Sequence, residues 1–253
     1  MHALRGRFKK DIVAEFMVPK HLPRPSHRRA GKVVILCDGM PTAWGSKPIL
    51  NFFAKKGYWV FHPRYRGTWE SGGKFLRHSP EKDILDVIDQ LPRGFRDAWS
   101  GKKYRVKPEK IYIIGSSFGG AATLLASRDK RVTRVVAISP VTDWSVRSKA
   151  EPLPWLAKVT HEAFGEGYRG AQKDWKRLGK GNFYNPMSYA DKIPGSKIMM
   201  IHAKDDESIS WKPSAHFAKK TGAQLWLLKR GGHMGLGLVM QLRFWKKIRV
   251  FLK

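Results

Sequence analysis

Cysteine, acidic residues and long apolar runs are all scarce in this sequence. The scarcity of cysteine and of apolar runs excludes internal disulfides and membrane spans. Cys37 is the one cysteine in 253 residues, so the chain cannot form an internal disulfide, and nothing indicates secretion. No stretch approaches the roughly 20 apolar residues that cross a bilayer. The opening segment, MHALRGRFKKDIVAEF, has basic residues but no apolar run after them, unlike a secretory signal. We therefore expect a cytoplasmic protein without a membrane span.

The shortage of acidic residues leaves a formal net charge of +29, from 49 Lys and Arg against 20 Asp and Glu. Such a charge can indicate a nucleic-acid or anionic membrane partner, because Lys and Arg displace the counterions of phosphates. Here the basic residues do not cluster. They occur as pairs, such as Lys55-Lys56 and Lys246-Lys247, and no nucleic-acid motif accompanies them. We therefore predict no nucleic-acid partner and attribute the charge to solvated faces.

The remaining composition is that of a globular protein. Hydrophobic residues make up 42% of the chain and aromatic residues 12%, enough to bury a core. Short apolar runs alternate with longer segments of helical periodicity. This alternation is typical of an α/β fold with a mostly parallel central sheet and helices on both faces. No repeat or flexible linker divides the chain, so we predict a single domain over residues 1–253.

The apolar runs predict where the strands and helices lie. The runs at 32–38 and 58–63 are continuous, as in buried strands, and the run at 11–19 alternates like an edge strand. The segment 79–91 has a helix-start signal, with Ser79 as N-cap. Further strands are expected at 110–115, 132–139, 197–203 and 223–229, and further helices at 46–57, 118–128, 211–221 and 236–252.

One segment interrupts this alternation. Residues 144–196 lie between two predicted strands and are too long for an ordinary connection. The segment is rich in aromatic residues, among them Trp144, Trp155, Phe164, Tyr168, Trp175, Phe183 and Tyr184. We predict that it is an inserted helical cap.

The segment GSSFG at residues 115–119 places a serine between glycines, after an apolar strand and before a helix rich in small residues. A serine that attacks a carbonyl needs an exposed oxygen, which a sharp strand-to-helix turn provides. Such a turn crowds the backbone, so the flanking positions favour glycine. This is the G-x-S-x-G nucleophile elbow, and it predicts Ser117 as the nucleophile.

A serine hydroxyl needs a base to take its proton, and the base needs an acid to orient it. In proteins with this elbow the acid and then the histidine follow the serine along the chain, each after a strand. Asp205 and Asp206 follow the strand at 197–203, and His233 follows the last strand. We predict a triad of Ser117, Asp206 and His233, with Asp205 making a turn or loop contact. The other histidines receive no catalytic role.

Acyl transfer also needs donors for the negative oxygen of the tetrahedral intermediate. The backbone N–H of Phe118, directly after the nucleophile, is one expected donor. The second is expected from the loop GMPTAWG after the strand at 32–38, with Met40 as its donor. A simple turn at Gly39 is the alternative. We interpret Cys37 as a small buried hydrophobic residue rather than a second nucleophile.

With these residues identified, the chain resembles the α/β-hydrolase superfamily, and within it the catalytic domain of prolyl oligopeptidase-like (acylaminoacyl and dipeptidyl peptidase-like) serine hydrolases. The resemblance covers residues 32–253 and rests on the segments CDGMP, PRYRGTWESGGKF, GSSFGG, SPVTDW, NPMSYADKI and RGGHMG. It implies an α/β-hydrolase fold. In that family the acid lies in a pattern H-x-x-x-D-x-x-[IV], which here runs from His202 to Ile209 and supports Asp206 as the acid.

Three departures from the family pattern favour ester hydrolysis over peptidase activity. The sequence shows no N-terminal propeller domain, has CDG where relatives often have His-Gly, and lacks an evident acidic pair for a substrate's amino terminus. We therefore expect a serine esterase acting on a small-molecule ester, with an aminopeptidase or acylpeptide hydrolase of short peptides as the alternative. No metal or organic cofactor is expected, because a Ser-His-Asp site performs its own acid–base chemistry. The oligomeric state is left open.

Overall fold

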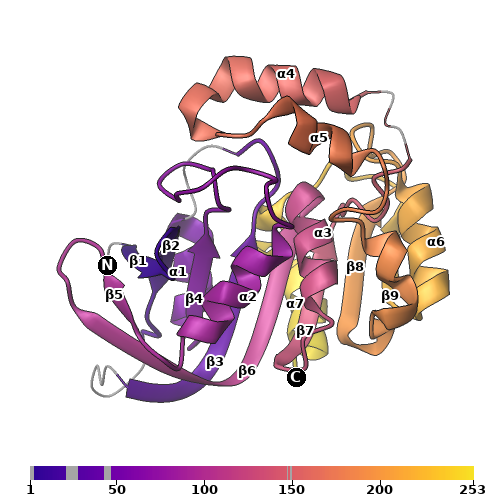
Figure 1. Ribbon diagram of the computed structural model, residues 1–253. Coiled ribbons are helices and arrows are strands. Elements are labelled where there is room, and N and C mark those ends of the chain that lie inside the picture. Colours follow the sequence, from indigo (N-terminus) through magenta and orange to yellow (C-terminus); the bar gives the residue numbers. More distant parts are fainter. Residues whose placement is uncertain (1–2, 21–27, 43–46, 147, 149) are drawn as a thin grey trace.

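The structure, a computed structural model, describes residues 3–20, 28–42, 47–146, 148 and 150–253, which form a nine-stranded sheet with helices around it (Figure 1). The strands are β1 (Leu4–Phe8), β2 (Ile12–Met17), β3 (Arg28–Cys37), β4 (Trp59–Pro63), β5 (Phe95–Asp97), β6 (Lys103–Ser116), β7 (Val132–Ile138), β8 (Ile198–Ala203) and β9 (Gln224–Leu228). The helices are α1 (Lys47–Lys55), α2 (Glu81–Gln90), α3 (Ser117–Ala126), α4 (Leu153–Phe164), α5 (Gln172–Leu178), α6 (Trp211–Thr221) and α7 (Leu242–Phe251). Short 3-10 helices are η1 (Gly165–Gly167), η2 (Pro186–Lys192), η3 (Gly195–Lys197) and η4 (Leu236–Met240).

The sheet is mixed, with strand order β3-β4-β2-β1-β5-β6-β7-β8-β9. Parallel pairings join β3 to β4 and β6, and then β6 to β7, β8 and β9 in succession. β1, β2 and β5 pair antiparallel with their neighbours. The expectation of a mostly parallel sheet therefore needs correction, because a hairpin near the N-terminus and the short β5 add antiparallel strands between β4 and β6.

These additional strands close part of the sheet into a ring, because β3 pairs with both β4 and β6. Aromatic side chains from the strands of this ring pack against one another. Phe8 and Phe95 stack with ring centroids 4.6 Å apart, and Phe16 contacts Phe95 and Tyr104 edge-on at 5.1 Å. This aromatic packing joins β1, β2, β5 and β6 into the core.

Alternate residues of β3 enter two different cores, which shows that both faces of the sheet are covered. Val33, Ile35 and Cys37 pack in a core with side chains of α2, α3 and α6. Val34 and Leu36 pack in a second core with side chains of α1 and α7. The period of two follows from the pleat of a strand, and the continuous apolar run is explained by burial of both faces.

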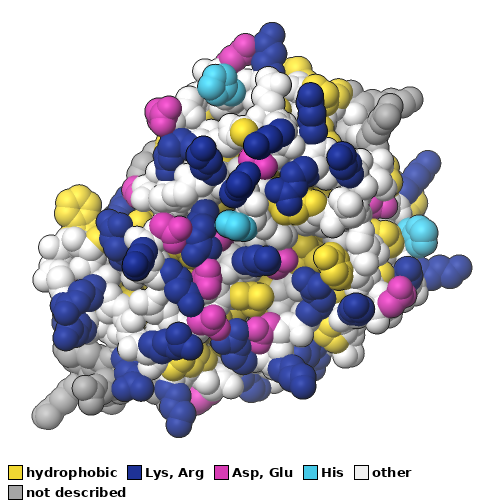
Figure 2. All heavy atoms as spheres, in the orientation of Figure 1, with side chains coloured by type: hydrophobic (Ala, Val, Ile, Leu, Met, Phe, Trp, Pro, Cys, Tyr) yellow, Lys and Arg dark blue, Asp and Glu magenta, His cyan; other side chains and the backbone are white. Residues whose placement is uncertain are grey.

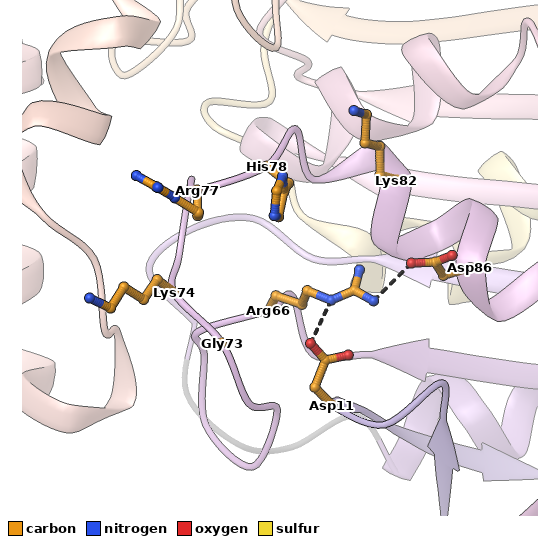
Figure 3. A pocket seen from close by; sticks show the side chains of 8 residues that line it. All are labelled: Asp11, Arg66, Gly73, Lys74, Arg77, His78, Lys82 and Asp86. Carbon is orange, nitrogen blue, oxygen red and sulfur yellow. Dashed lines mark hydrogen bonds and ion pairs between the residues drawn. The ribbon is translucent and has the colours of Figure 1, made fainter.

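The loop between β4 and α2 is held in place by Arg66 (Figure 3). Its guanidinium lies 2.8 Å from a carboxylate oxygen of Asp11, in the turn after β1, and 2.8 Å from one of Asp86, on α2. Asp83 accepts from both its guanidinium and its backbone N–H. The same loop carries Phe75, whose ring lies 5.5 Å from that of Phe118, the residue after the predicted nucleophile. Arg66 thus holds in place the loop whose Phe75 packs against Phe118.

The segment between β7 and β8 contains α4, η1, α5, η2 and η3, and α4 and α5 lie beyond the end of the sheet (Figure 1). Its aromatic residues pack onto the loop between β4 and α2. Trp69 contacts the rings of Phe164 and Tyr168, and Phe75 contacts Tyr168 and Trp175. The helical content predicted for residues 144–196 is confirmed.

Several element boundaries differ from those that the sequence pattern predicts. The residue before α2 is Pro80, and the Ser79 hydroxyl contacts the Glu81 carboxylate instead of capping the helix. The predicted helix at 236–252 is divided into η4 and α7 at Gln241, whose backbone is extended. β1 was not predicted.

Positive side chains are spread over the visible face of the molecule. On the face drawn in Figure 2, Lys and Arg side chains lie across the whole surface, with Asp and Glu between them, and do not gather in one patch. None of the described helices is both long and apolar enough to cross a membrane.

Candidate active site

The turn between β6 and α3 carries Ser117, the predicted nucleophile. β6 ends at Ser116 and α3 begins at the next residue, so the strand passes into the helix without a loop. Ser117 has a φ of 53°, in the left-handed region that non-glycine residues seldom adopt. Ser117 is half-buried, whereas Ser116 is buried. The predicted strand–turn–helix context of the G-x-S-x-G segment is confirmed.

Close backbone contacts explain the two glycines that flank this turn. A Cβ at Gly115 would lie 2.2 Å from Thr123 Oγ1 and 2.4 Å from the carbonyl oxygen of Gly119. A Cβ at Gly119 would lie 2.2 Å from the carbonyl oxygen of Cys37 and 2.3 Å from that of Asp38. No side chain fits at these separations, so both positions require glycine for the elbow to pack against β3.

The carboxylate of Asp206 is buried behind β8 and accepts hydrogen bonds on both oxygens. His233 Nδ1 lies 2.9 Å from Oδ2 and 3.1 Å from Oδ1, and the N–H of Ile209 donates to Oδ1 over 2.9 Å. Burial opposes ionisation, but hydrogen bonds from His202, His233 and Ile209 outweigh it and hold the pKa of Asp206 well below its ordinary value. Because an ionised carboxylate only accepts, the His233 nitrogen that faces Asp206, Nδ1, is the one that carries a proton.

The neighbouring Asp205 has a different set of partners. Its Oδ1 accepts from the backbone N–H groups of Gly231 and Gly232, both over 2.9 Å. The predicted loop contact of Asp205 is therefore confirmed. These bonds hold the glycine-rich turn that carries His233.

His202, to which the sequence analysis gave no catalytic role, lies directly against Asp206. It is fully buried, and its Nε2 lies 3.2 Å from Asp206 Oδ2 and 3.0 Å from the carbonyl oxygen of Ile209. Its Nδ1 lies 3.0 Å from Ser214 Oγ on α6. The signal that could have identified this contact is the spacing of four residues between His202 and Asp206 at the end of a buried strand.

The loop after β7 contacts both the elbow and the turn that carries His233. Ser139 Oγ accepts from the N–H of Met234 over 3.2 Å, and the N–H of Val141 donates to the carbonyl oxygen of Ser117 over 3.1 Å. Ser139 itself has a φ of 42°. The hydrogen bonds of the described residues do not include one between the Ser117 hydroxyl and His233. The structure thus joins Asp206 to His233 directly, and connects Ser117 to them through this loop.

The loop after β3, predicted to supply an oxyanion donor, passes close to the elbow. A Cβ at Gly39 would lie 3.2 Å from Ser117 Cβ. Thr42 anchors the loop: its hydroxyl donates to the carbonyl oxygen of Gly39 over 2.8 Å, and its N–H donates to the Tyr168 hydroxyl over 3.0 Å. Among the described residues, the N–H of Met40 donates no hydrogen bond to any partner.

The single cysteine lies behind this loop. Cys37 is fully buried at the end of β3, and burial raises the pKa of its thiol to about 12. At neutral pH it is therefore protonated and a poor nucleophile, as expected of a buried hydrophobic residue.

A cavity of about 980 Å³ opens beside Ser117, between the elbow and the α4–α5 segment. Met40, Ser117 and Phe118 lie along one part of its wall. Its apolar lining from residues 144–196 includes Trp144, Pro152, Leu153, Pro154, Leu156, Ala157 and Trp175. The cavity can therefore hold an apolar group next to the predicted nucleophile.

In the part of the chain that the structure describes, no group of three or more His, Cys, Asp or Glu side chains has the arrangement of a metal site.

The fold is shared with solved structures of low sequence identity. The Pyrococcus furiosus esterase Pf2001 aligns with a TM-score of 0.69 and 18% identity, over 99% of this chain and 89% of its own. The Pyrococcus horikoshii acylaminoacyl peptidase aligns with a TM-score of 0.63 and 18% identity, over 99% of this chain but 40% of its own. The sequence profile of the prolyl oligopeptidase family matches residues 44–234, most of the chain. The chain therefore belongs to the prolyl oligopeptidase family of serine hydrolases, which have the α/β-hydrolase fold.

Proposed function

We propose that this protein is a serine esterase that cleaves carboxylic esters through an acyl-enzyme on Ser117. The observation that carries the proposal is the pairing of His233 with the ionised, buried Asp206, at the same edge of the sheet as the strained Ser117. A carboxylate on Nδ1 fixes the imidazole as the tautomer whose Nε2 accepts a proton. This is the form that a general base for a serine hydroxyl needs.

In the proposed reaction, Ser117 Oγ attacks the ester carbonyl while His233 Nε2 takes its proton. The resulting imidazolium is stabilised by the charge of Asp206. His233 then gives the proton to the departing alcohol oxygen, which breaks the C–O bond and leaves the acyl group on Ser117. Water, deprotonated by His233, releases the acid and restores the serine. The proposed proton transfer requires His233 to reach Ser117 Oγ once the substrate is bound, and such hydrogen bonds are often absent in sites without a substrate.

The tetrahedral intermediate needs two backbone donors, for which we propose the N–H groups of Phe118 and Met40. Phe118 lies in the first turn of α3, where backbone N–H groups have no partner within the helix. Both residues line the same cavity as Ser117. Because Gly39 packs against Ser117, the Met40 peptide lies within reach of an oxygen attached to the attacked carbon.

We propose that the chain is a single domain in which residues 144–196 form a cap over the site. The α4–α5 segment supplies the apolar lining of the cavity next to Ser117. The cavity volume of about 980 Å³ suits an acyl or alcohol group with an aliphatic or aromatic body. The expected substrate is therefore a small ester with an apolar group.

Peptide hydrolysis is the second candidate, favoured by one observation: the fold is shared with an acylaminoacyl peptidase. The same Ser-His-Asp chemistry cleaves amides, so only the substrate-binding groups distinguish the two activities. The likeness to an esterase of similar length, which this chain covers over 89%, favours the ester.

The test compares ester substrates, which release p-nitrophenol, with anilide substrates, which release p-nitroaniline. Wild type, Ser117→Ala and His233→Ala are assayed with p-nitrophenyl acetate, butyrate and octanoate and with acetyl-alanine and alanine p-nitroanilides. The proposal predicts ester turnover that falls by at least about 1000-fold in both variants. Efficient anilide cleavage with negligible ester turnover would instead assign the protein as a peptidase.

A further inference from the structure

The environment of His202 determines which of its ring nitrogens carries a proton. Nε2 faces two oxygens that can only accept, the carbonyl of Ile209 at 3.0 Å and Oδ2 of Asp206 at 3.2 Å. Nε2 must therefore be the donor. Nδ1 faces the Ser214 hydroxyl at 3.0 Å, which can donate to it. All the hydrogen-bonding capacity of a neutral imidazole is thus satisfied, as a fully buried side chain requires.

The Nε2–H group of His202 also holds in place the loop that carries Asp206. The backbone of Ile209 is bound at both its polar atoms, because its N–H donates to Asp206 Oδ1 and its carbonyl accepts from His202. His202 lies on β8 and Ser214 on α6, so the ring ties the loop between these elements to both of them. The Asp206 carboxylate is therefore held by the Ile209 N–H on Oδ1 and by His202 on Oδ2, the oxygen that lies nearest His233.

We propose that His202 is a positioning residue for catalysis: its Nε2–H fixes the Asp206 carboxylate in the orientation that receives His233, and shares the negative charge. The inference rests on the proposed function, since the role of Asp206 as the acid is part of it. In the described part of the chain, His202 and His233 are the titratable side chains that contact this carboxylate, while Asp205 is turned to Gly231 and Gly232.

The proposed sharing of charge predicts a change in the pKa of His233 that a simple loss of packing at position 202 would not produce. If the donor on Oδ2 is removed, the charge of Asp206 is stabilised less by His202 and acts more strongly on His233. The imidazolium of His233 is then favoured, so its pKa rises, by an expected 0.5 to 1 unit, about half of the effect of a charged hydrogen bond. The lower limb of the pH profile of kcat/KM moves to higher pH by the same amount.

Two matched variants test this. His202→Phe keeps a planar ring without an N–H donor, and His202→Gln keeps an N–H donor near the position of Nε2. We expect kcat/KM for p-nitrophenyl acetate to fall about 10- to 100-fold in His202→Phe, from loss of orientation, and to recover at least tenfold in His202→Gln. Thermal unfolding and circular dichroism establish that both variants are folded.

Two NMR measurements keep the inference independent of activity. The ¹⁵N shifts of wild-type His202 should show a proton on Nε2, and titration of the His233 ring signals should show the raised pKa in His202→Phe. An Nδ1–H tautomer in the wild type, or equal His233 pKa values in wild type and folded His202→Phe, would overturn the inference. If His202→Phe does not fold, the inference is decided by the wild-type tautomer and by kcat/KM of His202→Gln relative to wild type. A wild type that hydrolyses no ester refutes the proposed function but leaves both NMR results to be measured.

Discussion

Substitution of Gly119 by alanine tests whether the elbow is as tightly packed as its geometry indicates. The new Cβ would lie 2.2 Å from the carbonyl oxygen of Cys37 and 2.3 Å from that of Asp38, where real contacts are not shorter than 3.0 Å. Both oxygens belong to the backbone at the end of β3, which is paired on both sides. A rotamer change therefore cannot relieve the contact, and α3 and the end of β3 must separate by roughly 1 Å.

The expected free-energy cost of Gly119→Ala lies at the upper end of the range for overpacking. Inserting a methyl group into a packed core costs about 1–3 kcal/mol, and a backbone contact lies at the upper end, so we expect about 3 kcal/mol. For a chain of this size, each kcal/mol lowers Tm by about 2–4 °C, which gives a loss of roughly 6–12 °C. Esterase turnover should fall more than about 100-fold, because the oxyanion loop and Ser117 move apart.

Urea and thermal unfolding, beside p-nitrophenyl acetate turnover, measure both effects. Gly237→Ala is the matched control, because a Cβ there meets its nearest atom, of Met240, at 4.0 Å. It should change the free energy of unfolding by less than about 1 kcal/mol in either direction. A Gly119→Ala protein as stable and as active as Gly237→Ala would refute the crowded elbow.

Three further predictions follow from the partners of individual side chains. Asp206→Asn should lower kcat/KM by about 10³- to 10⁴-fold, because an amide in place of the carboxylate supports the wrong His233 tautomer. Asp205→Asn should lower kcat/KM less than about tenfold, since the side-chain oxygen of the asparagine can still accept from Gly231 and Gly232. Because the folded-state pKa of Asp206 is depressed, its contribution to stability is complete above the unfolded pKa of about 3.9 and is lost as pH falls below it. Urea unfolding at pH 7 and pH 3 should therefore show a smaller stability difference between wild type and Asp206→Asn at pH 3, and an equal or larger difference there contradicts the assignment. Cys37 should react with iodoacetamide at pH 8 at least about 100-fold more slowly in the folded protein than in urea, measured by mass spectrometry.

Ser117 and His233, two residues of the proposed site, could be predicted because local sequence features mark each of them. Ser117 stands between glycines that the backbone contacts require, and His233 follows the last strand in a glycine-rich turn. The preference for Asp206 over Asp205 was supported by the family resemblance, and the hydrogen bonds of the two carboxylates agree with it. The contact of His202 with Asp206 is signalled in the sequence by their spacing of four residues, but this spacing alone does not distinguish a contact with the carboxylate from other structural roles of a buried histidine at a strand end.

The N-terminal part of the sheet was the least predictable from sequence. β1 has the sequence LRGRF, in which two arginines and a glycine hide the strand pattern. It forms a hairpin with β2, and it is held further by pairing with β5 and by stacking of Phe8 on Phe95, two contacts that join residues about 90 positions apart. Tertiary packing of this kind overrides local propensity. The closure of six strands into a ring is likewise a long-range property that no single segment indicates.

The proposed esterase function requires Ser117 to be the nucleophile, and one labelling measurement tests this. A fluorescent fluorophosphonate is added to wild type and to folded Ser117→Ala, and the labelled peptide is identified by mass spectrometry. We predict stoichiometric labelling of wild type on Ser117, together with loss of ester turnover, and no labelling of the variant. Folded wild type that does not react, or a label on another residue that persists in Ser117→Ala, would contradict the account.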